Sequence, residues 1–191
     1  MSLYNVALFL HVIGAIGYSA AVVVTLLGLV ALRRANRVEQ VRTIVGLIGL
    51  SDPVAVVSAL LILTAGLYMT ITVWGWQMGW INIALVTVVL TATLGVAIIE
   101  SRRKAIARLV QEDDPLAEEL NRRIHDPVLG TALYTLVGLV IGIIFLMTNK
   151  PALEGSILVI VISGALGLAV SLPLWRNRRT RIMTDSAKPT S

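Results

Sequence analysis

The chain contains no cysteine among its 191 residues, and only 14% of them are charged, against about a quarter in an ordinary soluble domain. The absence of cysteine excludes disulfide bonds and thiolate metal sites. The scarcity of charge leaves four long uncharged stretches, at residues 1–32, 53–99, 127–149 and 155–175. About 20 apolar residues in a helix cross the roughly 30 Å hydrocarbon layer of a bilayer, so each stretch is long enough to span a membrane.

The stretch 53–99 is long enough for two spans, with the tryptophan-rich turn WGWQMGW (residues 74–80) between them. Backbone groups in lipid must be satisfied within the segment, which favours helices. The sequence therefore predicts an all-α, polytopic bundle of five transmembrane helices. We expect one transmembrane domain over residues 1–183, with helices at approximately 4–32, 53–73, 80–100, 127–148 and 155–175, and a disordered cytoplasmic tail over 184–191.

The distribution of lysine and arginine predicts how the chain is threaded. Fifteen of the 16 lie at 33–42, 102–123 and 176–188, on connections at the same side of the predicted helices, and the exception is Lys150. Such residues collect on the cytoplasmic side, so we expect the N-terminus outside and the C-terminus inside a bacterial plasma (inner) membrane. Basic loops attract anionic headgroups, so the expected partner is the lipid bilayer and not a nucleic acid.

A two-helix unit is repeated weakly along the chain. SDPV at 51–54 and HDPV at 125–128 each follow an arginine-bearing loop, and the helix before each loop ends in an Arg-Arg pair. The pattern indicates a duplicated two-helix unit plus one extra helix. Asp52 and Asp126 are typical N-cap residues before a proline at the first helical position. Apolar residues at helical spacing over 38–48 predict a separate amphipathic helix on the inner membrane surface.

Two glycines four residues apart, Gly138 and Gly142 in GLVIG, form a seam of small residues in the fourth helix. Such seams let helix backbones approach closely in lipid. We expect the seam to serve helix contacts within the bundle. The alternative is a surface for self-association or for docking on a larger membrane complex.

The spans contain no Asp, Glu, Lys or Arg except Glu100 at the inner end of the third, which argues against a proton-coupled transporter. No Ser-His-Asp set, His-x-x-x-His pair or glycine-rich phosphate loop occurs. No catalytic residue is predicted, and an enzyme is the less favoured interpretation.

One ionisable side chain remains inside a span: His11, in LFLHVIGAIGYSA (residues 8–20). Helical spacing places Tyr18 on the same stripe, and at the outer ends of other helices Tyr68, Met69 and Met147 lie at a similar depth. An imidazole near thioethers is a plausible haem or copper(I) environment. The alternative is a neutral histidine that holds helices together through a hydrogen bond. His125 lies at the opposite membrane side, about 20 Å away, and cannot share one metal with His11.

The segments LFLHVIGAIGYSA and TAGLYM (residues 64–69) resemble a family of small bacterial polytopic membrane proteins, itself distantly similar to the copper-resistance D and HemJ-type proteins. The resemblance implies that His11 is a ligand of b-type haem or copper. The sequence departs from those proteins in having no second histidine at that depth and no intramembrane lysine.

Three functional interpretations follow from these patterns. The first is a structural or accessory membrane subunit without catalysis. The second is a haem- or copper-binding membrane protein with His11 as a ligand. The third, suggested by the duplication alone, is a permease for a small neutral solute.

Overall fold

The computed structural model describes residues 2–111 and 117–186, which are almost entirely helical and contain no strand. Two of the helical segments, η1 and η2, are π-helical, with a wider turn than an α-helix. In chain order the elements are α1 (Leu3–Leu32), α2 (Val38–Met69), η1 (Thr70–Trp74), α3 (Gly79–Leu94), η2 (Gly95–Glu100), α4 (Ser101–Gln111), α5 (Ala117–Ile124), α6 (Pro127–Asn149) and α7 (Leu153–Ser186).

Five helical stretches are long and apolar enough to cross a membrane, which confirms the predicted number of such helices. Their outward faces carry large apolar side chains with no cover from the rest of the chain. Leu50 is 72% exposed, Ile71 63% and Phe9 62%. Apolar faces of this extent are typical of a protein whose solvent is lipid.

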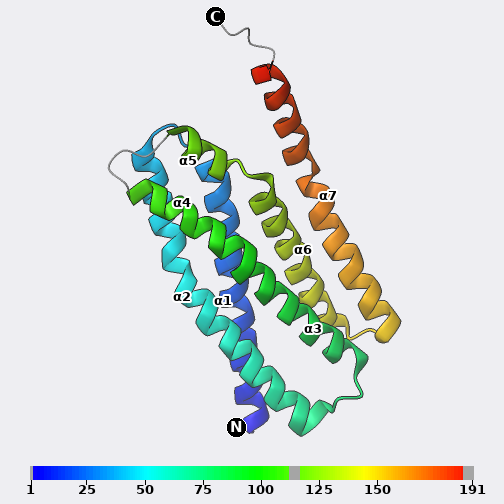
Figure 1. The fold of residues 1–191 in the computed structure, drawn as a ribbon. Coiled ribbons are helices and arrows are strands. Elements are labelled where there is room, and N and C mark those ends of the chain that lie inside the picture. The colour runs from blue at the N-terminus through cyan, green and yellow to red at the C-terminus, as the bar shows by residue number, and fades with distance from the viewer. Residues whose placement is uncertain (1, 112–116, 187–191) are drawn as a thin grey trace, which may run out of the picture.

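The helices form two antiparallel pairs with α3 against one of them. α1 packs along α2, α6 packs along α7, and α3 packs on α6 and α7. Figure 1 shows the N-terminus, the turn after η1 and the turn between α6 and α7 at one end of the bundle. The α1–α2 turn, α4 and α5 lie at the other end, beyond which the last turns of α7 project. This second end carries most of the arginines, and we call it the cationic end.

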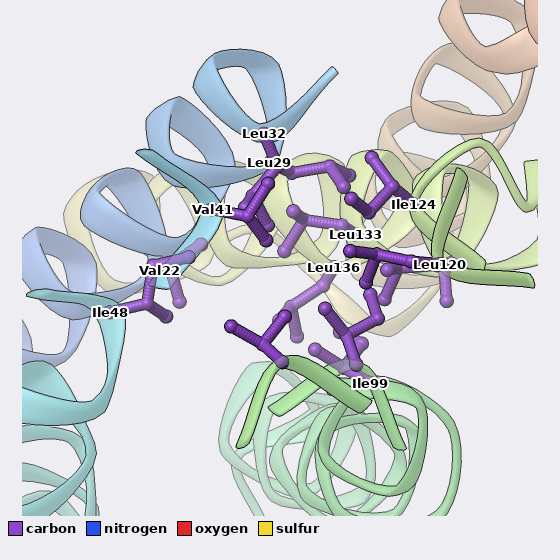
Figure 2. Packing of buried hydrophobic residues seen from close by; sticks show 14 residues of the cluster. Val22, Leu29, Leu32, Val41, Ile48, Ile99, Leu120, Ile124, Leu133 and Leu136 are labelled. Atoms are coloured by element: carbon purple, nitrogen blue, oxygen red, sulfur yellow. The ribbon is translucent and has the colours of Figure 1, made fainter. Parts of the chain in front are cut away.

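The main hydrophobic core lies toward the cationic end (Figure 2). Side chains from α1, α2, η2, α4, α5 and α6 meet there, and Leu133 and Ile106 are each 1% exposed. The short helix α5 adds Leu120 and Ile124 on its buried face, while its other face carries arginines. An amphipathic connection thus closes the core at the cationic end of the bundle.

The expected start of the second helix at Pro53 is wrong, because α2 begins at Val38 and continues through Pro53 to Met69. The apolar residues over 38–48 belong to this same helix, not to a separate amphipathic one, and pack in the same core cluster as α1. Pro53 has no N–H to donate to the carbonyl four positions earlier, that of Gly49, so α2 lacks one backbone hydrogen bond there. Asp52 therefore lies inside α2 and is not an N-cap.

Other boundaries differ by extension. α3, η2 and α4 run on as one helical rod to Gln111, past the expected end at residue 100. α7 continues to Ser186, so the first residues of the expected disordered tail are helical, and 187–191 lie outside the described residues. The fourth helix begins as expected: Asp126 caps α6 by accepting a hydrogen bond from the Val128 backbone N–H at 2.9 Å.

The glycine seam of α6 is covered by α7 of the same chain. A Cβ atom on Gly138 would meet the backbone oxygen of Ser163, and one on Gly142 would lie 2.9 Å from the Ser163 hydroxyl. Across the interface, a Cβ on Gly167 would lie 2.5 Å from the Tyr134 oxygen. The seam therefore serves close contacts between α6 and α7 within the bundle.

Candidate functional site

A cavity of about 370 Å³ lies between α1, α2, η1 and α3, near the end of the bundle opposite the cationic end. Its walls are almost wholly apolar. The residues that line it are His11, Ile62, Leu63, Thr64, Gly66, Leu67, Met69, Thr70, Trp74, Trp76, Trp80, Ile81, Ala84, Leu85, Val88 and Met147. A volume of this order is typical of sites for small organic molecules.

His11 is the only ionisable side chain that lines this cavity. Its Nδ1 lies 2.9 Å from the backbone oxygen of Ile62. A carbonyl only accepts hydrogen bonds, so Nδ1 carries the proton, and a neutral ring then presents a lone pair at Nε2. Nε2 has no hydrogen-bond partner among the described residues. Nε2 is also accessible from outside the protein. Among the described residues, the one buried side-chain polar atom without a hydrogen-bond partner is Thr135 Oγ1.

Gly66 on α2 makes room for the imidazole. A Cβ atom at this position would lie 3.1 Å from Cε1 and 3.2 Å from Nδ1 of His11. The ring edge therefore packs directly on the backbone of α2, where it also reaches the Ile62 oxygen. This contact fixes the ring against one wall of the cavity.

The structure brings together only some of the predicted ligand residues. Met69 and Met147 line the same cavity as His11, from α2 and α6. Tyr68, one residue and about 100° around the helix from Met69, packs against the small cluster of Ala7, Ala65 and Met69 and is not among the residues that line the cavity. Tyr18 lies about 10 Å further along α1 than His11 and packs against the main core. Neither tyrosine contributes to the cavity wall.

Trp74 and Trp80 line the cavity, and Lys150 lies over their rings without lining the cavity itself. The rings of Trp74 and Trp80 meet edge to face with centroids 5.7 Å apart. The Lys150 ammonium lies 4.3 Å from the Trp74 ring centroid and 5.9 Å from that of Trp80, which is cation–π geometry. Sequence reasoning treated Lys150 only as an exception in the charge distribution. The available signal was that the connection with Lys150 lies on the same side of the predicted helices as the tryptophan-rich turn.

The π-helical segment η1 places Trp74 at this end. Its wider turn is closed by a 2.7 Å hydrogen bond from the Gly75 N–H to the Thr70 oxygen, five residues back. Gly75 then adopts a φ of 74°, which favours glycine. π-helical turns occur often at functional sites, and the sequence gives little sign of them.

A second polar cluster, the arginine clamp, lies at the cationic end. The clamp consists of Arg103 paired with Asp52 and Arg102 paired with Asp126. Arg33 joins it by donating to the backbone oxygens of Ile124 and Asp126, both at 3.4 Å. Burial lowers the pKa of the Arg33 guanidinium below its ordinary value, although Arg33 stays a cation at neutral pH. Every charge in this cluster has a partner, so the clamp ties helices together.

His125 lies in the turn between α5 and α6, at the cationic end, with Nδ1 3.0 Å from the Asn121 oxygen. The two histidines thus belong to opposite ends of the bundle, as expected. The described residues contain no group of three or more His, Cys, Asp or Glu side chains placed to hold a metal ion. Any metal chemistry at His11 would have to use the methionine sulfurs.

No protein-family model, curated protein or solved structure matches this chain.

Proposed function

We propose that this protein is a polytopic plasma-membrane protein that binds a lipid-soluble organic ligand, with His11 as the polar anchor of the site. The observation that carries the proposal is the His11 ring, held by the Ile62 oxygen, with its second nitrogen free at an apolar cavity. Nε2 is not buried within the protein, but a polar atom that faces apolar walls without a hydrogen-bond partner still costs free energy. A ligand that bonds Nε2 removes that cost.

The size of the cavity favours an organic ligand over a bare metal ion. Metal–ligand bonds are about 2.0–2.3 Å long and draw their ligands into a compact shell. A cavity of about 370 Å³ is far larger than that shell. A purely structural or accessory role leaves such a cavity without a purpose, because close packing is the rule in protein interiors.

A b-type haem is the second candidate ligand, favoured by the sulfurs that share the cavity with His11. His11 and one of the two methionines, Met69 or Met147, would hold the haem iron. Lys150, over the Trp74 ring, would offer a cation to a propionate. A bound haem would supply one-electron chemistry. The resemblance to copper-resistance D and HemJ-type proteins supports this candidate, and copper(I) remains its variant.

We further propose that the N-terminus lies outside and the C-terminus inside the cell, as the cation distribution favours. In this orientation the cavity opens toward the outer half of the bilayer. His11 lies eight residues into α1, about 12 Å along its axis.

The test is to purify the protein gently and identify what accompanies it. Organic extraction with mass spectrometry reports a bound molecule, and an absorption spectrum reports haem. We expect a stoichiometric ligand that is lost in His11→Ala and retained in His125→Ala, which removes the other histidine. A ligand-free preparation that also binds no apolar probe added to it would contradict the proposal.

A further inference from the structure

We infer that the ligand of this cavity carries a phenolic hydroxyl that donates its hydrogen bond to His11 Nε2. This inference rests on the proposed function and names its ligand class. Two observations carry it: Nδ1 of His11 is already hydrogen-bonded to the Ile62 oxygen, and tryptophan rings line the cavity that Nε2 faces.

The hydrogen-bonding direction at His11 selects a donor. Nδ1 donates to the Ile62 oxygen at 2.9 Å, so Nε2 of the neutral ring accepts. The hydroxyls of Thr64 and Thr70 also line the cavity, but each donates to a carbonyl of its own helix, at 2.7 Å and 2.9 Å. Nε2 is therefore the nitrogen of the His11 ring that can accept a hydrogen bond from a ligand. A ketone or an ether has no hydrogen to give it.

The shape of the wall selects an aromatic body. Trp74, Trp76 and Trp80 line the same cavity, with Trp74 and Trp80 held edge to face. Aromatic rings pack well against such surfaces in offset or edge-to-face arrangements. A phenol joins such a ring to a hydroxyl, and its hydroxyl is a stronger donor than that of an aliphatic alcohol.

The ligand would enter from the lipid. Leu63 and Leu67 of α2 and Leu85 of α3 line the cavity, yet they are 38%, 46% and 37% exposed. The cavity therefore reaches the apolar outer surface between α2 and α3. A long alkyl substituent on the phenol can remain in the bilayer while the ring occupies the site.

The experiment compares 4-hexylphenol with 4-hexylanisole, which differ by a methyl group on the oxygen. Binding to the full-length protein in nanodiscs is measured by calorimetry, with empty nanodiscs subtracted. A net hydrogen bond of about 1 kcal/mol corresponds to about fivefold in affinity. We expect the phenol to bind about fivefold more tightly. This preference should vanish in His11→Leu and persist in the matched control His125→Leu.

Nitrogen NMR of the wild-type protein keeps the inference testable if His11→Leu does not fold. The chain has two histidines, so ¹⁵N-histidine labelling gives two rings, and His125→Gln assigns them. We expect the phenol, but not the anisole, to move the Nε2 resonance of His11. Equal binding of both probes with an unmoved Nε2 would overturn the inference while the proposed function stands. Failure of both probes to bind would overturn both the inference and the proposed function. A co-purified haem would overturn the inference of a phenolic ligand and favour haem, the second candidate ligand.

Discussion

Arg103 donates from both terminal guanidinium nitrogens to the two carboxylate oxygens of Asp52, each across 2.8 Å. The pair joins α2 to α4 over 51 residues of sequence, and Arg103 is only 18% exposed. Its neighbour Arg102 pairs with Asp126 at the start of α6. Consecutive arginines thus bind the aspartates of both Asp-Pro motifs, and α4 is fastened between two transmembrane helices.

Asp52→Asn should destabilise the protein by about 1 kcal/mol, because the bidentate pair is partly exposed and a charge-assisted bond is lost. The measurement is the free energy of unfolding in detergent micelles. Glu39→Gln removes one negative charge from the first turn of the same helix, at an exposed site without an ion pair among the described residues. It should leave stability unchanged. Equal stability of both variants would show that the clamp contributes nothing.

Gly66→Ala should weaken ligand binding several-fold, because the new methyl group would lie about 3.1 Å from the His11 ring and push it off the Ile62 oxygen. Gly46→Ala, in open space on the same helix, is the matched control. It should keep full affinity and raise helix stability by up to about 1 kcal/mol. Affinity for the co-purified ligand or for 4-hexylphenol is the readout. Unchanged affinity in Gly66→Ala would place the ligand away from His11.

Gly138→Ala should separate α6 from α7 and destabilise the protein by about 1–3 kcal/mol, because the added methyl meets backbone that cannot yield. Gly164→Ala lies on the facing helix, where a Cβ would be at an ordinary 3.4 Å from Leu139. Thermal unfolding of the two variants should therefore differ clearly. If Gly138→Ala were as stable as Gly164→Ala, the two helices would not pack in this register.

Lys150→Gln should lower stability by about 0.5–1 kcal/mol through loss of the cation–π contacts with Trp74 and Trp80. Lys150→Arg keeps a cation that stacks on aromatic rings and should therefore retain most of this stabilisation. Thermal unfolding gives the stability, and tryptophan emission reports on the two rings directly. Identical emission in the wild type and both variants would show that the ammonium does not sit on the rings.

The orientation can be read by labelling, since the chain has no cysteine of its own. Gln77 and Asn36 are exposed and lie in turns at opposite ends of the bundle. In intact cells, Gln77→Cys should react with a membrane-impermeant maleimide. Asn36→Cys should react only after the cells are opened. The reverse pattern would invert the proposed threading and place the cavity toward the cytoplasm.

The number of long apolar helices could be predicted because it depends on the absence of charge, which is plain in one sequence. The start of α2 could not be predicted in the same way. Asp52 and Pro53 fit a helix start as well as Asp126 and Pro127 do. Local preference is identical at the two motifs, and tertiary contacts decide: Asp126 caps α6, while Asp52 turns to Arg103.

The candidate site was predictable in part for a similar reason. Depth along each helix follows from counting residues, so Met69 and Met147 could be placed near His11. Rotation about each helix axis depends on packing, and it directs Tyr18 and Tyr68 elsewhere. Gly66 was not singled out at all, because a glycine that accommodates a distant ring has no local signature.

The π-helical turn at η1 makes the length of this segment matter as much as its composition. Such a turn holds one residue more than an α-helical turn, and each residue rotates an α-helix by about 100°. A chain with one residue fewer here would still reach the membrane surface, but Trp74 would point in another direction and Lys150 would lose the nearer of its two rings. For this reason we expect natural variants to keep the residue count of this turn together with Trp74 and Gly75.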